Sequence, residues 1–128
     1  MSIISVVIGS VREGRFSEKP AAWIAAHLSK REGVEARLLD LREFPMPFFD
    51  QAAMPSIPGR GAYQHPVVQR WTHAIGGSDG FIFVAPEYNH GPAAVLKNAL
   101  DWVKFPGNSG QRLRVITPRA DASTPVRS

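Results

Sequence analysis

The sequence predicts a three-layer α/β domain with a parallel sheet, and three observations predict it. Residues 81–84 form an apolar run of β-branched and aromatic side chains, which is typical of a strand buried on both faces. Residues 3–8 have the same character. Between these two runs, the apolar residues of segment 17–31 recur at helical spacing. Buried strands that alternate with amphipathic helices indicate βαβ units and therefore a parallel sheet.

Length and composition limit the class of protein. A chain of 128 residues is long enough for one domain with one core, and its hydrophobic fraction of 44% is ordinary. No apolar run is long enough to span a membrane, and the N-terminus opens on a strand pattern instead of a secretory signal. The cytoplasm is therefore the expected compartment. The absence of cysteine excludes disulfides and thiolate metal sites, and the histidines lack paired metal-ligand spacing.

The net charge of +4 does not predict a nucleic-acid-binding protein. Residues 1–102 contain ten Lys or Arg and ten Asp or Glu, so the whole excess lies in residues 103–128. No aromatic residues interleave with the arginines there, as they do in many nucleic-acid surfaces. Neither a nucleic acid nor a membrane is an expected partner.

The chain opens with a βαβ pattern. Residues 3–8 are the first strand, and a polar loop leads to a helix from about 17 to 31. Ser17 is a plausible N-cap, and Pro20 lies in the first turn, where proline is tolerated. Gly33 ends the helix, and residues 35–39 form the second strand. The helix face that packs on the sheet is expected to consist of Ala21, Ile24, Ala25 and Leu28.

The next segment, 42–66, is predicted to be irregular because it contains five prolines. A loop of this length in a compact domain usually has a function. The alternative is a loop that merely folds over the core. The apolar residues expected to anchor it in either case are Phe44, Met46, Phe48 and Phe49.

Two further helices flank the central strand. A stripe at 67–75 predicts one helix, which the glycines at 76 and 77 end. Strand 81–84 follows, and Pro86 ends it because proline cannot donate to a sheet ladder. A third helix is predicted from Pro92 to about 103, with proline in its first turn. The core-facing residues of these helices are expected to be Val67, Trp71, Ala74 and Ile75 in the first, and Leu96, Ala99, Leu100 and Val103 in the second.

The loop that follows the first strand is a candidate anion site. Free backbone N–H groups and the helix dipole favour negative charge at such a strand-to-helix loop. Ser10 and Ser17 add hydroxyl donors, and Arg12 and Arg15 add guanidinium groups that suit phosphate oxygens. Neither the Gly-x-Gly-x-x-Gly dinucleotide fingerprint nor a Walker loop is present. A single phosphate is therefore the favoured ligand, with a merely solvated loop as the alternative.

The turn after the central strand is the second candidate site. Pro86, Glu87, Tyr88 and Asn89 place a carboxylate, a phenol and an amide at the carboxyl end of a buried strand, where open α/β sheets bind ligands. A simple polar turn is the alternative. In the flavodoxin-like strand order 2-1-3, the first and third strands are neighbours, so the two loops flank one crevice. A phosphate at one loop and a flat ring at the other describe flavin mononucleotide (FMN).

These residues resemble a known family, the NAD(P)H-dependent FMN reductases with their quinone- and azo-reductase relatives. The resemblance covers residues 3 to 102 in order and spacing. It depends on four motifs together, since none is specific alone. The motifs are Gly9-Ser10-x-Arg12-x-Gly14-Arg15, Phe44-Pro-Met-Pro-Phe-Phe-Asp50, Pro86-Glu-Tyr-Asn-His-Gly-Pro92 and Lys97-Asn-Ala-Leu-Asp-Trp102.

The resemblance implies a function and a set of site residues. It implies hydride transfer from NAD(P)H to bound FMN and from there to a flavin, a quinone or a similar small acceptor, in a homodimer. Ser10, Arg12 and Ser17 would hold the FMN phosphate, and Arg15 would help there or approach the dinucleotide. The motif at 97–102 looks structural, and no residue is nominated as catalytic or as a metal ligand. The residues that would line the isoalloxazine are Pro86, Glu87, Tyr88 and Asn89.

The C-terminal part departs from the family pattern. The resemblance predicts an FMN-binding domain over residues 1–104, incomplete on its C-terminal side, and a divergent basic tail over 105–128. Residues 113–117 are the candidate fourth strand, and 118–128 are expected not to pack on the core. The abrupt change of composition suggests a frameshift or an early stop in the reading frame. Two alternatives to the reductase therefore stay open, a one-electron flavodoxin-type carrier and a truncated, non-enzymatic remnant or interaction module.

Overall fold

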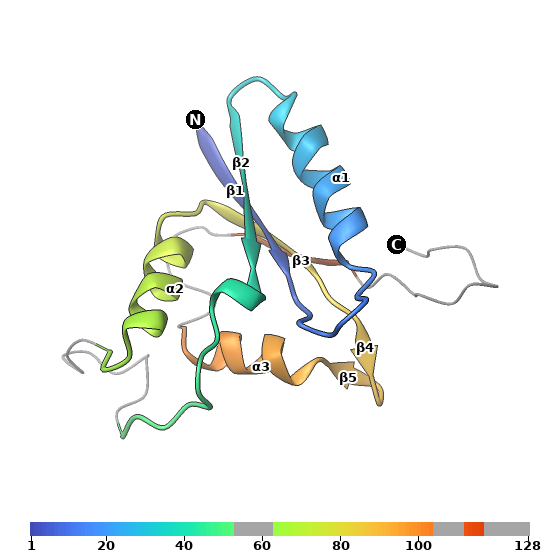
Figure 1. Cartoon of the computed structure of the whole chain (residues 1–128). Coiled ribbons are helices and arrows are strands. Elements are labelled where there is room, and N and C mark those ends of the chain that lie inside the picture. Colours follow the sequence, from blue (N-terminus) through green and yellow to red (C-terminus); the bar gives the residue numbers. More distant parts are fainter. Residues whose placement is uncertain (53–62, 104–111, 117–128) are drawn as a thin grey trace.

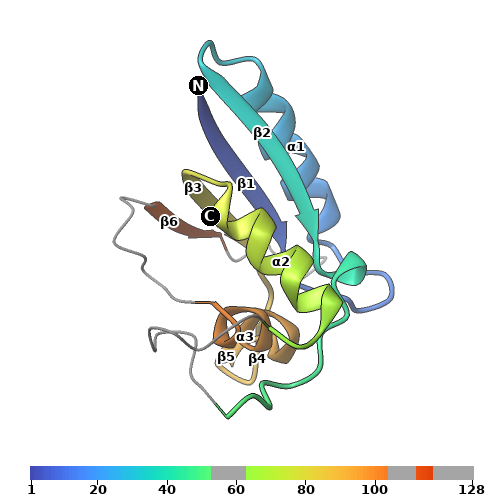
Figure 2. The same ribbon diagram turned by 90° about the vertical axis from the view of Figure 1, so that its left-hand side faces the viewer.

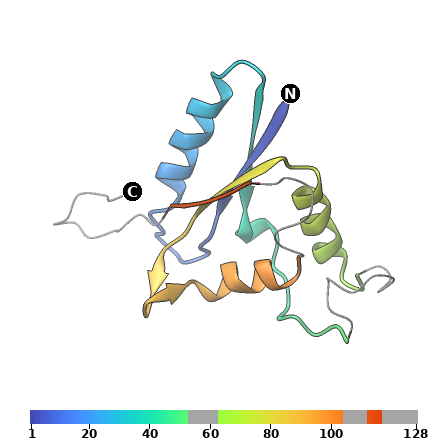
Figure 3. The same cartoon turned by 180° about the vertical axis from the view of Figure 1, so that it is seen from behind.

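A computed structural model of the chain describes residues 1–52, 63–103 and 112–116. Its main sheet has four parallel strands in the order β2-β1-β3-β6. This confirms the predicted parallel sheet with the order 2-1-3 and the candidate fourth strand, which lies beside β3 (Figure 3). In chain order these strands are β1 (Ser2–Ile8), β2 (Val34–Asp40), β3 (Gly80–Val84) and β6 (Arg112–Ile116).

Helices cover both faces of this sheet and make the predicted three layers. Helix α1 (Glu18–Ser29) lies on one face, and α2 (Pro66–Gly76) and α3 (Ala94–Asp101) lie on the other (Figures 1 and 2). A 3-10 turn, η1 (Leu41–Glu43), continues β2 toward the long loop. None of the helices in the described ranges is long and apolar enough to cross a membrane.

The strands distribute their side chains between the two faces with the period of two that a sheet requires. Val6 and Ile8 belong to a buried cluster with Ala21 of α1. Val7, between them in the sequence, belongs to the larger cluster that contains Trp71 of α2. The continuous apolar run of β1 therefore follows from burial on both faces, as it does in β3.

Helix α3 holds the long loop in place through two side chains. The amide of Asn98 donates to the carbonyl oxygens of Met46, at 3.1 Å, and Pro47, at 3.0 Å. The indole N–H of Trp102 also donates to the carbonyl of Pro47, at 2.9 Å. Proline-rich segments leave carbonyl groups without ladder partners, and here side chains satisfy them. These contacts agree with the expected structural role of motif 97–102.

The predicted apolar anchors of the loop are only partly correct. Phe44 is buried against Trp71, with ring centroids 5.3 Å apart, and Phe49 packs against Trp102 at 4.9 Å. Phe48, in contrast, is 78% exposed and anchors nothing. Two adjacent phenylalanines in an extended chain point to opposite sides, so only one of them can reach the core.

The structure refines three helix predictions. Ser17 is the N-cap residue of α1, as predicted, but its hydroxyl makes no capping bond. In α2 the buried residues include Val68, and the predicted Val67 is partly buried and packs against the same core. Helix α3 begins at Ala94, because Pro92 belongs to a short hairpin strand and not to the first helical turn.

Segments 53–62, 104–111 and 117–128 lie outside the described residues. The expectation that residues 118–128 do not pack on the core concerns residues outside the described ranges. The polar stretch 105–111 also lies outside them. The division of the chain into a domain of residues 1–104 and a tail therefore stays a prediction.

Candidate functional site

The two candidate loops meet at the carboxyl edge of the sheet. β1 and β3 are hydrogen-bonded neighbours, so the loops that leave them start side by side. The hydroxyl oxygens of Ser10 and Tyr88 lie 3.4 Å apart across the two loops, within reach of a weak hydrogen bond. Their separation in the sequence is 78 residues. The structure thus brings one polar group of each loop together at the ends of the first and third strands, where the sequence predicts a shared crevice.

Gly9 lets the first loop leave β1 against the backbone of β3. Its N–H donates to the carbonyl of Val84 at 2.8 Å. A Cβ atom on Gly9 would lie 3.2 Å from that carbonyl oxygen and from Ala85 Cβ, and 3.3 Å from Leu96 Cδ2. Only glycine fits this approach without a shift of the neighbouring backbone.

We expect Gly9→Ala to lower the free energy of unfolding by about 1–3 kcal/mol, because the added methyl group overpacks the site. Urea unfolding followed by circular dichroism measures the change. Gly76→Ala is the matched control, since a Cβ there meets nothing within 4 Å. That variant should be neutral or more stable by about 0.4–1 kcal/mol. Equal stability of the two variants would contradict the proposed close approach.

The first loop contains a tight turn over residues 12–15. The N–H of Arg15 donates to the carbonyl of Arg12 at 3.2 Å. Gly14, third in the turn, has φ of 69°, a conformation that L side chains rarely adopt. The Ser10 hydroxyl accepts the N–H of Arg12 at 3.3 Å. A backbone hydrogen bond therefore closes the turn, and a glycine permits its conformation.

The predicted phosphate ligands differ in their availability. Arg12 is exposed, and its guanidinium group has no hydrogen bond or ion pair with any other described residue. The hydroxyl of Ser17 also lacks a partner among the residues described, although Ser17 is only 3% exposed. Ser10 is 2% exposed and contacts the second loop. Among the described residues, a guanidinium group and a hydroxyl group without partners thus lie in the loop before α1.

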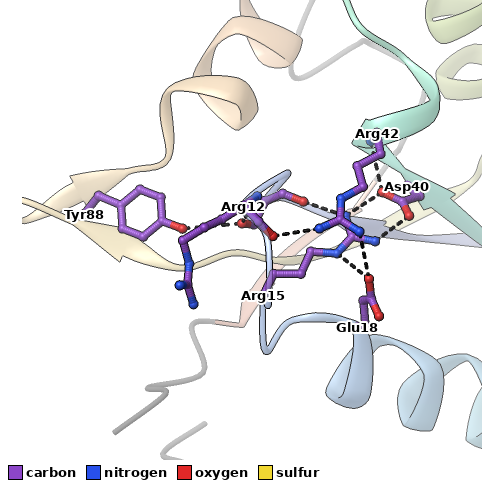
Figure 4. Close-up of polar contacts among 7 residues, drawn as sticks. Arg12, Arg15, Glu18, Asp40, Arg42 and Tyr88 are labelled. Carbon is purple, nitrogen blue, oxygen red and sulfur yellow. Dashed lines mark hydrogen bonds and ion pairs between the residues drawn. The ribbon is translucent and has the colours of Figure 1, made fainter.

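Arg15 faces the protein instead (Figure 4). Its Nη1 donates to the carbonyl of Ser10 at 2.6 Å and to Asp40 Oδ1 at 2.7 Å, and Nη2 pairs with the other carboxylate oxygen of Asp40. Its Nε donates to Glu18 at 2.8 Å. The side chain is only 3% exposed. These bonds favour a structural role, and direct contact between Arg15 and a phosphate stays a prediction.

Charge pairing shifts the pKa values of both Arg15 and Asp40. The hydrogen bonds from Arg15, and to a lesser extent the backbone N–H of Arg42, hold the pKa of the Asp40 carboxyl below its usual value. Asp40 in turn raises the pKa of Arg15. The pair is therefore charged throughout the neutral range.

Sequence reasoning missed Asp40, Glu18 and Arg42 as parts of this site. Arg42 donates to the carbonyl of Arg12 at 2.7 Å and to Glu18 at 3.3 Å. One signal was available for Asp40, because it ends β2 at the same sheet edge as the two loops. The spacing of Arg15 and Glu18, which is i,i+3, was a second signal.

The second loop is a β-hairpin that the sequence did not reveal. Strand β4 (Glu87–Tyr88) pairs antiparallel with β5 (Gly91–Pro92). Asn89 and His90 form its turn with φ of 52° and 63°, as a type I′ turn requires. Glu87, Tyr88 and Asn89 are exposed on this hairpin, and Pro86 is half-buried at its base. Tyr88 thereby presents 41% of its surface to solvent beside the first loop.

Among the described ranges, no group of three or more His, Cys, Asp or Glu side chains is placed to hold a metal ion. The candidate site consists of two polar loops at one sheet edge. One loop offers hydroxyl, amide and guanidinium donors, and the other offers an aromatic ring with a flanking carboxylate and amide.

Comparison with known proteins gives consistent matches. The family model described as NADPH-dependent FMN reductase matches residues 1–117. An NAD(P)H-dependent FMN reductase of Schizosaccharomyces pombe is 34% identical over 114 residues, which are 89% of this chain and 56% of that protein. A 2-hydroxy-1,4-benzoquinone reductase of a Burkholderia species is 33% identical over 104 residues, which are 80% of this chain and 50% of the relative.

A solved structure also matches the fold. The flavoenzyme FerB of Paracoccus denitrificans, an NAD(P)H:(acceptor) oxidoreductase, superposes with a TM-score of 0.66 at 25% identity. The match covers 95% of this chain and 63% of FerB. The chain thus spans about half the length of the curated relatives named above and less than two thirds of FerB.

Proposed function

The chain belongs to the NADPH-dependent FMN reductase family, and from that premise we propose that it binds FMN between its two loops and reduces it with NAD(P)H. A quinone or a similar small molecule would then accept the electrons, as the name of the Burkholderia relative indicates for that protein. The observation that carries the proposal is the 3.4 Å contact between Ser10 and Tyr88. It brings a phosphate-type loop and an aromatic hairpin to one place.

The first loop suits the phosphate end of FMN. Arg12 supplies a cation that no described acidic group neutralises, and Ser17 supplies a hydroxyl without a described partner at the start of α1. Ser10 completes the set with a buried hydroxyl. A dianionic phosphate that accepts from a guanidinium group and from hydroxyl groups forms charge-assisted bonds, which are the strong ones. The positive end of the helix dipole adds to the attraction.

The second loop suits the ring end. Tyr88 is a partly exposed aromatic side chain on a two-strand hairpin, two residues after Pro86, whose ring is apolar. Glu87 and Asn89 flank them with polar groups that can hydrogen-bond the edge of a heterocycle. We propose that Pro86, Glu87, Tyr88 and Asn89 line the isoalloxazine ring.

Bound FMN would supply the hydride chemistry, and the residues of this chain would bind and orient it. The first loop fixes one end of the molecule and the hairpin the other, so the ring is held in one orientation. None of the site residues has to transfer a proton in this scheme. Homodimer formation and a cytoplasmic location stay predictions from the sequence and the resemblance.

Replacing Arg12 by Ala should weaken FMN binding roughly ten- to a hundredfold, because a charge-assisted hydrogen bond contributes about 1.5–3 kcal/mol. Riboflavin, which has the same ring and no phosphate, should lose much less affinity. Isothermal titration of the purified protein with each flavin measures both constants. Equal losses for the two flavins would contradict the phosphate assignment.

The reaction itself is tested with the same wild-type protein. Flavin absorbance should fall when NADPH or NADH is added without oxygen, and it should return when a quinone is added. Bound flavin that neither dinucleotide reduces would favour the flavodoxin-type carrier instead. A protein that binds no flavin would overturn the proposed function.

A further inference from the structure

Two arginines bind the main chain of the first loop from the side of the protein that faces away from the second loop. Arg15 donates to the carbonyl oxygen of Ser10 at 2.6 Å, and Arg42 donates to the carbonyl oxygen of Arg12 at 2.7 Å. We propose that Arg15 and Arg42 are positioning residues, which orient the peptide groups of this loop so that its N–H groups face the phosphate. The inference depends on the proposed function, because it concerns the same site.

The geometry of the planar trans peptide determines where the N–H groups of the loop point when its carbonyl groups are bound. In one peptide unit the C=O of a residue and the N–H of the next residue point in opposite directions. A carbonyl of Ser10 that is bound to Arg15 therefore turns the N–H of Val11 away from Arg15. In the same way, the carbonyl of Arg12 bound to Arg42 turns the N–H of Glu13 away from Arg42.

These two N–H groups are free to bind a ligand. Neither the N–H of Val11 nor that of Glu13 makes a hydrogen bond with any other residue that the structure describes. Figure 4 shows the Arg15–Asp40–Arg42 cluster on one side of the loop, and Tyr88 with the Arg12 side chain on the other. The two donors thus point away from the cluster. The N–H of Arg12 between them is bonded to the Ser10 hydroxyl, so the loop offers two alternate N–H groups to an anion.

The two arginines are themselves fixed by acidic residues from other elements. Asp40, at the end of β2, pairs with Arg15 through both carboxylate oxygens and also accepts the backbone N–H of Arg42 at 3.0 Å. Glu18, in the first turn of α1, accepts from both guanidinium groups. The Arg15 guanidinium, held by a two-point contact, loses little further freedom when it binds a carbonyl. The Arg42 guanidinium has one acidic partner, Glu18. The network therefore connects the loop to β2 and to α1.

A preordered loop binds its ligand more tightly, because ordering does not have to occur on binding. This effect differs from a direct contact between Arg42 and the phosphate, which would leave the ligand-free loop unchanged. The order of the loop without ligand is therefore the decisive observable.

Arg42→Met is the main variant, because its side chain is 40% exposed and its removal is compatible with folding. Arg37→Met is the matched control. Arg37 is an exposed arginine of β2 that is paired with Glu35, so its replacement removes the same charge without touching the loop. Backbone ¹⁵N relaxation of the ligand-free proteins gives the order parameters of the Val11 and Glu13 amides.

We expect wild type and Arg37→Met to give order parameters of about 0.85 at both amides, and Arg42→Met to give less than about 0.6 at Glu13. The affinity of Arg42→Met for FMN should fall about tenfold, whereas its affinity for riboflavin should stay near that of wild type. Arg15→Lys keeps the positive charge opposite Asp40 but lacks the several N–H donors of the guanidinium group. It should therefore lower the order parameter of the Val11 amide more than that of the Glu13 amide.

Three outcomes would overturn the inference. The first is a loop that is already mobile in the wild type. The second is an Arg42→Met loop that stays ordered while FMN binding weakens, which would mean direct contact with the phosphate. The third is an Arg37→Met variant whose loop order parameters and FMN affinity fall as much as those of Arg42→Met. If the wild type binds no flavin, the proposed function fails, and the order parameters still decide whether the arginines order the loop.

Discussion

Replacing Arg15 by Met is expected to lower the free energy of unfolding by about 1–3 kcal/mol, because it leaves a partly buried carboxylate and a buried carbonyl without their donor. The methionine keeps much of the side-chain volume and removes every donor. Asp40 would then lose its two-point partner, and the carbonyl of Ser10 would lose its only described donor. The Arg15 side chain is 3% exposed and that of Asp40 is 23% exposed, so water could replace only part of these bonds.

Chemical unfolding monitored by circular dichroism measures this loss. Arg37→Met serves again as the control, because the Arg37–Glu35 pair is 45% exposed on both sides and such pairs contribute about 0–1 kcal/mol. A loss of less than about 1 kcal/mol in Arg15→Met, comparable to that control, would show that the buried pair contributes no more than an exposed one.

The same pair predicts how stability depends on pH. Hydrogen bonds from Arg15 depress the pKa of Asp40 in the folded state below the usual value for aspartate, about 3.9. The stabilisation is therefore fully present above the unfolded pKa and is lost as the pH falls through the folded pKa. Wild-type stability should decrease below about pH 4, and Asp40→Asn should remove part of this decrease. If the stability of Asp40→Asn decreased at acid pH as much as that of the wild type, the decrease could not be assigned to Asp40.

Deleting residues 105–128 is expected to make the protein aggregate. β6 pairs with β3 over five residues, from Gly80 opposite Arg112 to Val84 opposite Ile116. Without β6, the hydrogen-bonding edge of β3 would be open. That strand is Phe-Ile-Phe-Val after its glycine and contains no charge or proline. Exposed edges of this composition pair with other chains.

Light scattering and size-exclusion chromatography of the shortened chain measure the effect. The matched control is deletion of residues 118–128 alone, which keeps β6 and should leave both stability and flavin binding nearly unchanged. A soluble, monomeric fragment of residues 1–104 that unfolds in one cooperative step would show that the edge of β3 needs no cover. Aggregation of both shortened chains would instead assign the effect to the last eleven residues, 118–128.

The sequence by itself determined the layers, the strand order and the position of the two loops. Strands β1 and β3 were predictable because a strand buried on both faces needs a continuous apolar run, and few other structures tolerate one of that length. Pro86 marked the end of β3, and Gly9 and Gly14 marked the first loop. Local chemistry and periodicity are sufficient for features of this kind.

The tertiary structure decided what each polar side chain contacts. Arg12 and Arg15 are alike in type and lie three residues apart, yet Arg12 is exposed and Arg15 is buried against Asp40. The loop sequence does not contain this difference, because Asp40 is 25 residues from Arg15 along the chain. Likewise, the partial burial of Phe49 and the exposure of Phe48 depend on where Trp102 lies.

The hairpin at 87–92 is a second feature that local sequence preference did not predict. Asn89 and His90 both adopt positive φ values, which are uncommon for residues other than glycine, although Asn and His are enriched among those that adopt them. The sequence indicates a helix start at Pro92, since proline favours that position. In the structure Pro92 pairs opposite Glu87 and α3 begins at Ala94. Local preference was overridden because α3 must lie against the sheet, where Leu96 and Ala99 are buried, and the hairpin supplies the turn that puts it there.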